Sequence, residues 1–293
     1  MKESKSLLLF LSPIILVICI VYSMICWTFY VSVTNWVGMA PPSSLNIIGL
    51  ENYISLINME RFWNAIKNNL IWLITFAIPA TSLGFILALL LDQRIRGESI
   101  FRSIFLFPTA ISYVITGTLW SWMYDPAVGV INTMLRALKL DFLAGPWVTD
   151  PNIALYCLVI AAIWQCSGIS MVIYLASLRS IPPSLIESAL IDGASFLQIV
   201  RYVIIPSPQI IYATVMVLAM QIMFSLKVFD IVWVMTMGGP GYSTDVLANF
   251  MFIATFRQDY MGLGAGIAVV IFLLSLAIII PYSLFVMKKW YGW

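Results

Sequence analysis

The sequence predicts an all-α membrane protein with six transmembrane helices, and three observations support this prediction. Of its 293 residues, 62% are hydrophobic and only 10% are charged, whereas a soluble domain typically carries about 25% charged residues. The mean hydropathy is +0.99. Six apolar stretches are each long enough to cross a hydrocarbon core, which takes about 20 mostly apolar residues per helix. So little polar surface cannot cover a globule in water, and lipid must therefore cover the rest.

Each predicted span is an almost unbroken apolar run. The six spans cover residues 7–33, 70–91, 104–124, 153–178, 210–234 and 265–287. The first resembles a secretory signal in having Lys2 and Lys5 ahead of it. It is too long for the apolar part of a signal, however, and no A-x-A cleavage site follows it. We therefore expect it to remain as a membrane helix.

The basic residues predict that both chain ends lie in the cytoplasm, because cytoplasmic loops carry the excess of Lys and Arg in membrane proteins. With this orientation nine basic residues lie inside and five outside, and Lys227 falls within or near the fifth span. The nine are Lys2, Lys5, Arg94, Arg96, Arg102, Arg179, Arg201, Lys288 and Lys289, and the five are Arg61, Lys67, Arg136, Lys139 and Arg257.

Composition also excludes several classes of function. The net charge is only +2 and the basic residues are scattered, so we expect no nucleic-acid partner. The absence of histidine removes serine–histidine and cysteine–histidine pairs, H-E-x-x-H sites and most zinc or haem sites. No G-x-x-x-x-G-K-[ST] loop occurs, so the chain does not bind ATP through one. The cysteines, Cys19, Cys26, Cys157 and Cys166, lie in apolar stretches without C-x-x-C spacing and are expected to be helix fillers.

The segment between the fourth and fifth spans carries the most specific pattern in the chain. Pro182 and Pro183 stop the incoming helix. Ser184 is expected to cap a new helix, with Glu187 completing a capping box. Small residues follow, and two prolines close the segment: Ser188, Ala189, Gly193, Ala194, Pro206 and Pro208. A short capped helix with small side chains can let another protein approach and pass a displacement into the membrane. A plain surface loop is the alternative.

This segment resembles the signature loop of binding-protein-dependent ABC transporter permeases, E-A-A-x-x-x-G followed by I-x-x-P. The chain has Glu187-Ser188-Ala189, then Asp192-Gly193-Ala194, then Ile204-Ile205-Pro206. Serine replaces the usual second alanine and is nearly as small. The extended form of the sugar-type permeases, I-P-P-x-x-x-E-A-A-x-x-D-G-A with a later glutamine, is matched almost throughout residues 181–198.

The resemblance extends over most of the chain. It includes Gly49-Leu50-Glu51-Asn52-Tyr53, then Phe62-Trp63-Asn64-Ala65 with Asn68, then Arg102, Phe107-Pro108 and the Trp120/Trp122 pair. The stretch from Phe229-Asp230 through Thr236, Gly238-Gly239-Pro240-Gly241 and Thr244 is similar to the outer loop of the maltose- and glycerol-phosphate-type first permease subunit. A partner subunit usually lacks that loop, so the chain resembles the first of two different permeases.

The resemblance implies the type I ABC importer permease fold, with a core formed by spans two to six and the first span alongside. Residues 1–64 would form the N-terminal helix and an extracytoplasmic loop, and residues 65–293 the core, with a coupling loop at 182–206. It also implies a multi-pass protein of the cell membrane, without enzymatic activity or a cofactor of its own. ATP and Mg²⁺ would be bound by two ATPase subunits, while a second, different permease and an extracytoplasmic solute-binding protein would complete the importer. The residues expected to contact the ATPase are Glu187, Ser188, Ala189, Asp192, Gly193, Ala194 and Pro206.

Polar residues within the spans are the candidates for the solute path. Lys227 and Asp230 lie three residues apart near the outer part of span five; they either neutralise one another or line an outer gate. The uncharged candidates are Gln165, Ser167 and Ser170 on span four and Gln221 and Ser225 on span five. Each of these can equally hydrogen-bond a neighbouring helix.

Two other classes of protein fit six spans. A secondary transporter or channel is the main alternative, but no inverted repeat is visible and the coupling loop has no purpose there. An intramembrane enzyme would need a serine–lysine or two-aspartate site, and no two aspartates lie at mid-depth in two spans. The sequence leaves the solute open among neutral sugars, short oligosaccharides, polyols and glycerol phosphates.

Overall fold

The computed structural model describes residues 2–39, 41, 45–93 and 96–291, with side chains between residues 12 and 284. Within these residues, five helices are long and apolar enough to cross a membrane, and a bent pair of helices makes a sixth span when the two are taken together. The predicted all-α fold with six spans is therefore confirmed. The cytoplasmic position of both ends stays a prediction, and Arg94, one of the residues counted for it, lies outside the described residues.

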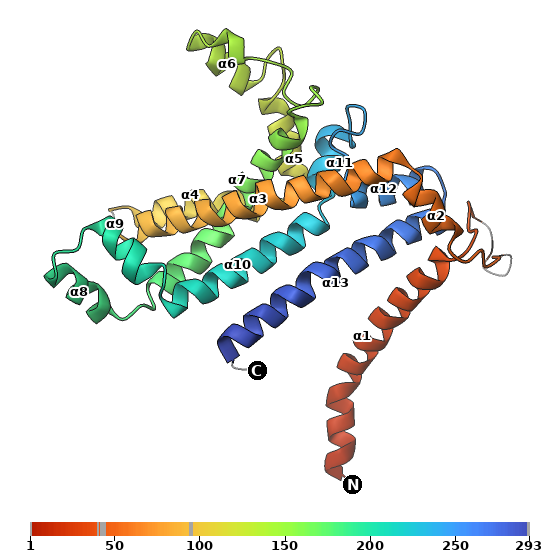
Figure 1. Ribbon diagram of the computed structural model, residues 1–293, viewed down its shortest axis with the longest axis horizontal. Helices are drawn as coiled ribbons and strands as arrows, with labels where there is room; N and C mark the ends of the chain where they lie inside the picture. Colours follow the sequence, from red (N-terminus) through yellow and green to blue (C-terminus); the bar gives the residue numbers. More distant parts are fainter. Residues whose placement is uncertain (1, 40, 42–44, 94–95, 292–293) are drawn as a thin grey trace. The chain divides into compact units, whose positions relative to one another are not determined.

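The long helices are α1 (Lys2–Ser32), α3 (Glu60–Asp92), α7 (Ala154–Leu178), α10 (Pro208–Leu226) and α13 (Met261–Tyr291) (Figure 1). The shorter ones are α2 (Glu51–Ile57), α4 (Glu98–Ala110), α5 (Tyr113–Met123), α6 (Val130–Ala137), α8 (Pro183–Ile191), α9 (Phe196–Ile199), α11 (Asp230–Thr236) and α12 (Leu247–Phe252). A 3₁₀ turn, η2 (Asp141–Leu143), and two π-helical turns, η3 (Val200–Ile204) and η4 (Ile253–Arg257), complete the set. The chain divides into two compact units, residues 1–63 with 250–274 and residues 64–249 with 275–293.

In the first unit, α2 holds the C-terminal end of α1. The amide Nδ2 of Asn52 donates to the carbonyl oxygens of Ser32 and Thr34, both at 2.9 Å, and the hydroxyl of Tyr53 donates to Ser32 Oγ at 2.7 Å. A Cβ on Gly262 would lie 2.3 Å from the carbonyl oxygen of Thr34, so this backbone approach requires glycine. The Asn-Tyr pair after the first span is thus explained by its contacts.

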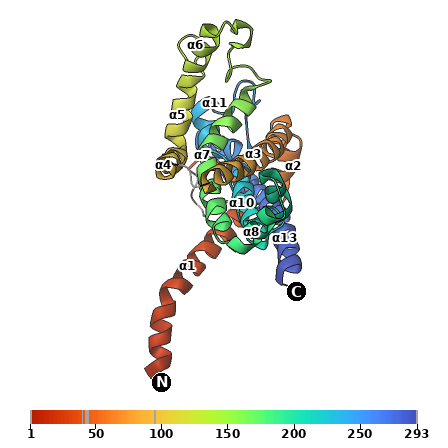
Figure 2. The same ribbon diagram turned by 90° about the vertical axis from the view of Figure 1, so that its left-hand side faces the viewer.

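In the second unit, α7 is the central helix, because it packs against α4, α5, α10 and α11. Two clusters of buried side chains fill the interior: one gathers around Trp72, Phe76 and Leu158, and the other around Met171 and Tyr174. Figures 1 and 2 place α6 and α8 far apart, at different ends of this unit.

The third span is broken, so the prediction of one helix over residues 104–124 is wrong. Helices α4 and α5 meet at an angle of 102°. Pro108 lies in the last turn of α4, and Ile111 is extended with ψ of 154°. Ser112 then caps α5 by accepting the N–H of Ile115 at 3.3 Å. A side-chain cap inside an apolar run starts a new helix, whereas hydropathy alone averages over the break.

The fifth span is shorter than the predicted 210–234, because α10 ends at Leu226 and α11 begins at Asp230. Lys227 is the C-cap residue of α10. Lys227 and Asp230 therefore lie on different elements rather than one turn apart on one helix. Both are exposed and they form no ion pair with each other. The predicted neutralising pair is wrong, while the gate role remains untested.

Replacing Gly168 with leucine is expected to prevent stable folding of the second unit. A Cβ at this position would lie 2.3 Å from the carbonyl oxygen of Phe105 and 2.9 Å from Thr109 Oγ1, so α4 and α7 would have to separate. Overpacking of this kind costs typically about 1–3 kcal/mol and sometimes more. We expect a loss of monodisperse protein in size-exclusion chromatography in detergent. Gly145→Leu is the control, because nothing lies within 4 Å of its added Cβ; equal yields of the two variants would contradict this packing.

Candidate coupling site

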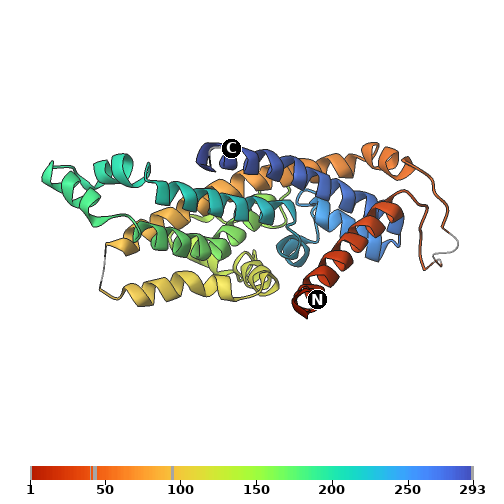
Figure 3. The ribbon, with the colours of Figure 1, turned by 90° about the horizontal axis from the view of Figure 1, so that it is seen from below.

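The predicted coupling segment forms two short helices that stand clear of the spans on either side of it. Helix α8 begins directly after Pro182, and α9 leads through η3 into α10. Figure 3 shows α8 and α9 beyond the ends of α7 and α10. The predicted separate helix over this segment is present in the structure, and Pro206, which is exposed, lies between η3 and α10.

The capping box predicted for Ser184 and Glu187 is wrong. Pro182 is the N-cap residue of α8, Pro183 is its first helical residue, and no side chain caps the helix. Proline suits this position because its fixed φ matches a helix and its missing N–H would be unpaired there. The capping box of this segment instead starts α9, where Ser195 N donates to Gln198 Oε1 at 2.7 Å.

A left-handed turn at Gly193 separates the two helices. Gly193 has φ of +79°, a conformation that glycine adopts without steric cost. Its N–H donates to the Leu190 carbonyl, and the next N–H, of Ala194, donates to the Ala189 carbonyl, both at 3.0 Å. Nothing lies within 4 Å of a Cβ added to Gly193. The glycine is therefore needed for the backbone turn, and within this chain not for close packing.

The segment exposes large apolar side chains. No residue of α8 is buried, and Ile191 and Leu197 expose 86% and 76% of their surface. Leu185, Leu190 and Phe196 are exposed as well. Such a cluster of exposed apolar side chains marks an interaction surface. We call Leu185, Leu190, Ile191, Phe196 and Leu197 the apolar edge.

The polar residues Glu187, Ser188 and Asp192 of the segment are exposed. Glu187 is exposed and forms no hydrogen bond or ion pair with any residue that the structure describes. Asp192 is exposed at the C-cap, and Ser188 Oγ donates to the Leu185 carbonyl at 3.1 Å. Ala189 and Ala194 are half-buried beneath them. A partner that docks here meets a free carboxylate beside the apolar edge.

Buried side chains attach the segment to the spans. Ile181, Ile199 and Ile204 expose 4–5% of their surface and belong to the cluster around Met171 and Tyr174. The exposed helices are therefore anchored by an apolar base that packs in one cluster with buried side chains of α7 and α10. A close-packed base of this kind resists deformation.

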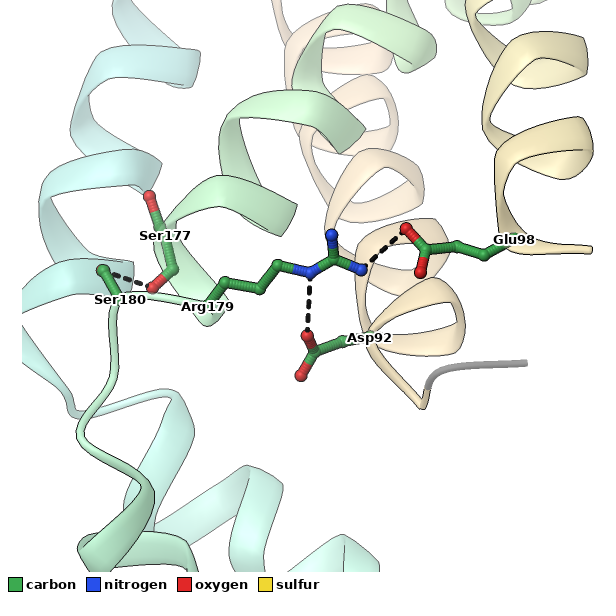
Figure 4. A network of polar contacts seen from close by, with 5 residues as sticks. All are labelled: Asp92, Glu98, Ser177, Arg179 and Ser180. Carbon is green, nitrogen blue, oxygen red and sulfur yellow. Dashed lines mark hydrogen bonds and ion pairs between the residues drawn. The ribbon is translucent and has the colours of Figure 1, made fainter. Parts of the chain in front are cut away.

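An ion-pair cluster that sequence reasoning missed lies beside this base. Arg179, at the end of α7, places Nη2 2.7 Å from Glu98 Oε1 on α4 and Nε 3.6 Å from Asp92 Oδ1 on α3. Figure 4 shows the guanidinium between the two carboxylates. A cavity of about 630 Å³ lies between this cluster and α8, whose Pro183, Ile186 and Glu187 help to line it. The only signal in the sequence is that all three charges lie at span ends.

The predicted solute-path residues are buried within the chain. Gln221 Nε2 donates to Ser170 Oγ at 2.9 Å, which joins α10 to α7. Ser225 Oγ donates to the Gln221 carbonyl at 2.8 Å. Gln165 Nε2 donates to the Ile111 carbonyl at 2.8 Å, at the break of the third span and not between spans four and five. The Gln221 and Gln165 contacts join neighbouring elements, the Ser225 contact lies within α10, and a role toward the solute stays a prediction.

The loop after α11 is held by an asparagine of α3. Asn68 Nδ2 donates to the carbonyl oxygens of Ser243 at 3.0 Å and Asp245 at 2.8 Å. Gly238 within the loop has φ of +90°. Asn68 and the glycine–proline loop are far apart in the sequence, but hydrogen bonds join them in the structure.

Comparison with known proteins identifies the family. The profile described as "Binding-protein-dependent transport system inner membrane component" matches residues 80–288, more than half of the chain. A probable ABC transporter permease protein of Pyrococcus horikoshii is 46% identical, with 96% of this chain and 97% of that protein covered. A xylose/arabinose import permease protein of Haloferax volcanii is 34% identical, covering 94% of this chain and 86% of that protein.

A solved structure shares the fold. One chain in the crystal structure of a bacterial alginate ABC transporter, in complex with a periplasmic protein that binds an alginate pentasaccharide, superimposes with a TM-score of 0.84. It is 23% identical, and the likeness covers 98% of this chain and 95% of that one. The predicted permease fold is thereby confirmed. The chain belongs to the family of binding-protein-dependent transport system inner membrane components and is a multi-pass, non-catalytic permease subunit of an ABC importer.

Proposed function

We propose that this chain imports a sugar or sugar-like solute as one half of a path formed with a second, different permease. Two ATPase subunits drive it from the cytoplasm, where the chain ends and α8 lie, and an extracytoplasmic binding protein delivers the solute. The relatives support the solute class: besides the xylose/arabinose permease, an alpha-glucoside transport system permease protein of Rhizobium meliloti is 37% identical over 84% of this chain and 73% of that protein. A trehalose/maltose transport system permease protein of Thermococcus litoralis is 30% identical over 96% of this chain and 93% of that protein.

One observation carries the coupling role. The coupling segment exposes the apolar edge and the carboxylate of Glu187, while its isoleucines Ile181, Ile199 and Ile204 are buried in the same cluster as residues of α7 and α10. A channel or secondary transporter has no use for it, because neither exchanges force with a cytoplasmic motor. Helices α8 and α9 are the elements through which ATPase movement reaches the spans.

Solute-stimulated ATP hydrolysis by the complete complex tests the proposal. We expect the complex purified through a tag on this chain to contain a second permease and two ATPase chains. In proteoliposomes, one of xylose, arabinose, maltose or trehalose should raise hydrolysis only when the binding protein is present. Two copies of this chain without another permease would contradict the predicted composition. Uptake that runs on an ion gradient without ATP would contradict the ATP-driven mechanism.

A further inference from the structure

The break of the third span lies roughly 20 Å along α4 from the ion pair at the start of this helix. Helix α4 is joined to α7 at both of its ends: Glu98 pairs with Arg179 at the end of α7, and Ile111 O accepts from Nε2 of Gln165 in the middle of α7. At about 1.5 Å per residue, the intervening 13 residues of α4 span roughly 20 Å. The segment of α7 from Gln165 to Arg179 gives about the same length. Glu98 and Arg179 lie at the ends of their helices, so the break falls within a hydrocarbon core about 30 Å thick.

The break leaves backbone groups without partners. The N–H groups of Ser112, Tyr113 and Val114 find no acceptor within the described chain; only the next N–H, of Ile115, is taken by Ser112 Oγ. Thr109, Ala110 and Ser112 are exposed, so the described residues of the second unit do not cover the break. Unpaired backbone at this depth is not tolerated against lipid, and it persists only where protein covers it or where it lines a water-filled cavity.

An unpartnered acceptor belongs to the side chain that hydrogen-bonds the break at Ile111. Gln165 exposes 2% of its surface. Its Nε2 donates to the Ile111 carbonyl, and its Oε1 has no hydrogen-bond partner among the described residues. The first amides of α5 are donors at the positive end of a helix, whereas Gln165 Oε1 can only accept. A hydroxyl group satisfies both, because it donates one hydrogen bond and accepts others. A carboxylate or an ammonium group satisfies only one of them.

We propose that the break between α4 and α5 lines the water-filled solute path, and that the first amides of α5 together with Gln165 bind hydroxyl groups of the passing solute. The proposal rests on the proposed import of a sugar-like solute and adds where that solute is contacted. The proposal places the solute contact at the broken third span, whereas the sequence analysis expects it between spans four and five. Gln165 Oε1 is buried by side chains of this chain itself, so the solute reaches it when the helices around the break rearrange.

Labelling by thiol reagents tests whether the break between α4 and α5 is accessible to water. In a variant with its four native cysteines replaced, Ala110→Cys and Ser112→Cys are introduced singly into the complete complex in proteoliposomes. Ile104→Cys is the control, because Ile104 is exposed on α4 but lies within the regular helix, away from the break. We expect a charged, membrane-impermeant methanethiosulfonate to modify positions 110 and 112 at least tenfold faster than position 104, in the nucleotide-free or the ATP-bound state. Equal rates at the three positions, or no reaction at positions 110 and 112 in either state, would overturn the proposal.

Substitution of Gln165 tests the hydroxyl-binding role. The probes are whichever of xylose, arabinose, maltose and trehalose stimulates hydrolysis, and its monodeoxy analogues. In the wild type we expect one analogue to have a KM for uptake about tenfold above that of its parent, the effect of one lost hydrogen bond. In Gln165→Met this difference should vanish, whereas Gln165→Glu, which keeps an acceptor, should retain it. An unchanged difference in Gln165→Met would overturn the role. If no sugar stimulates hydrolysis, the proposed solute class fails, and the labelling result still decides whether the break is wet.

Discussion

Replacing Gly193 with valine is expected to abolish solute uptake while the chain still inserts and folds. The turn holds φ at +79°, and a left-handed conformation costs an L-residue roughly 1–2 kcal/mol, more for a β-branched one. The chain escapes this strain by changing the angle between α8 and α9. Because no atom lies within 4 Å of the added Cβ, the effect arises in the backbone of this chain.

A graded series at position 193 separates backbone strain from steric obstruction by a partner. Asparagine adopts the left-handed conformation more readily than other non-glycine residues, so Gly193→Asn should keep most of the uptake. Gly193→Ala should fall between asparagine and valine. The measurement is the number of solute molecules imported per ATP hydrolysed in proteoliposomes. If asparagine is as harmful as valine, side-chain size and not φ decides, and a close approach by the ATPase explains the glycine instead. Full coupling in Gly193→Val would contradict both explanations.

Replacing Ile191 with aspartate should weaken ATPase docking by at least 100-fold. Ile191 is the most exposed residue of the apolar edge, and central apolar anchors of interfaces contribute about 2 kcal/mol or more when removed. A buried aspartate adds the cost of an unpaired charge. The dissociation constant between the permease pair in detergent and the purified ATPase is the quantity to measure.

The control for Ile191 is Phe142→Asp. Phe142 exposes 80% of its surface in η2, in the segment between α5 and α7, at the other end of the unit from α8. This change should leave docking unaltered. Glu187→Gln completes the set. Since Glu187 has no partner among the described residues, its loss should not alter the thermal midpoint, and any weakening of docking reports a basic partner on the ATPase. Normal docking by Ile191→Asp would remove α8 from the interface.

Hydropathy predicted the spans well because each is a long apolar run, and the all-helical architecture follows from those runs alone. It failed at the third span, where Pro108 and Ser112 carry the signal of a break but do not lower the mean hydropathy. It failed again at the fifth span, where α10 and α11 are separated only by residues 227–229. A break this short does not change the mean hydropathy of the window that contains it. Local chemistry at one or two residues decides such boundaries, whereas window averages do not register it.

The coupling segment was found because its proline, glycine and small residues are consecutive in the sequence. Its cap was misplaced because Ser184–Glu187 and Ser195–Gln198 have the same spacing, and only the start of α8 at Pro183 distinguishes them. The Arg179 cluster could not be predicted, since it joins the ends of three helices whose packing is set by contacts such as Gly168 against Phe105. The same holds for Gln165, whose neighbour Ile111 lies at a break that hydropathy does not detect.

Hydrogen–deuterium exchange over residues 181–204 tests the coupling role most directly, because it needs no substitution. The exchange of the permease pair is compared with and without the ATPase subunits, in the absence of nucleotide. The backbone of α8 and α9 is exposed and should exchange quickly alone, and docking should slow it at least tenfold over α8 and the apolar edge. Residues 130–143, which include α6 and η2, serve as the internal reference and should not change. Unchanged exchange over residues 181–204, with protection appearing elsewhere in the permease pair, would contradict the assignment of this segment to the ATPase interface.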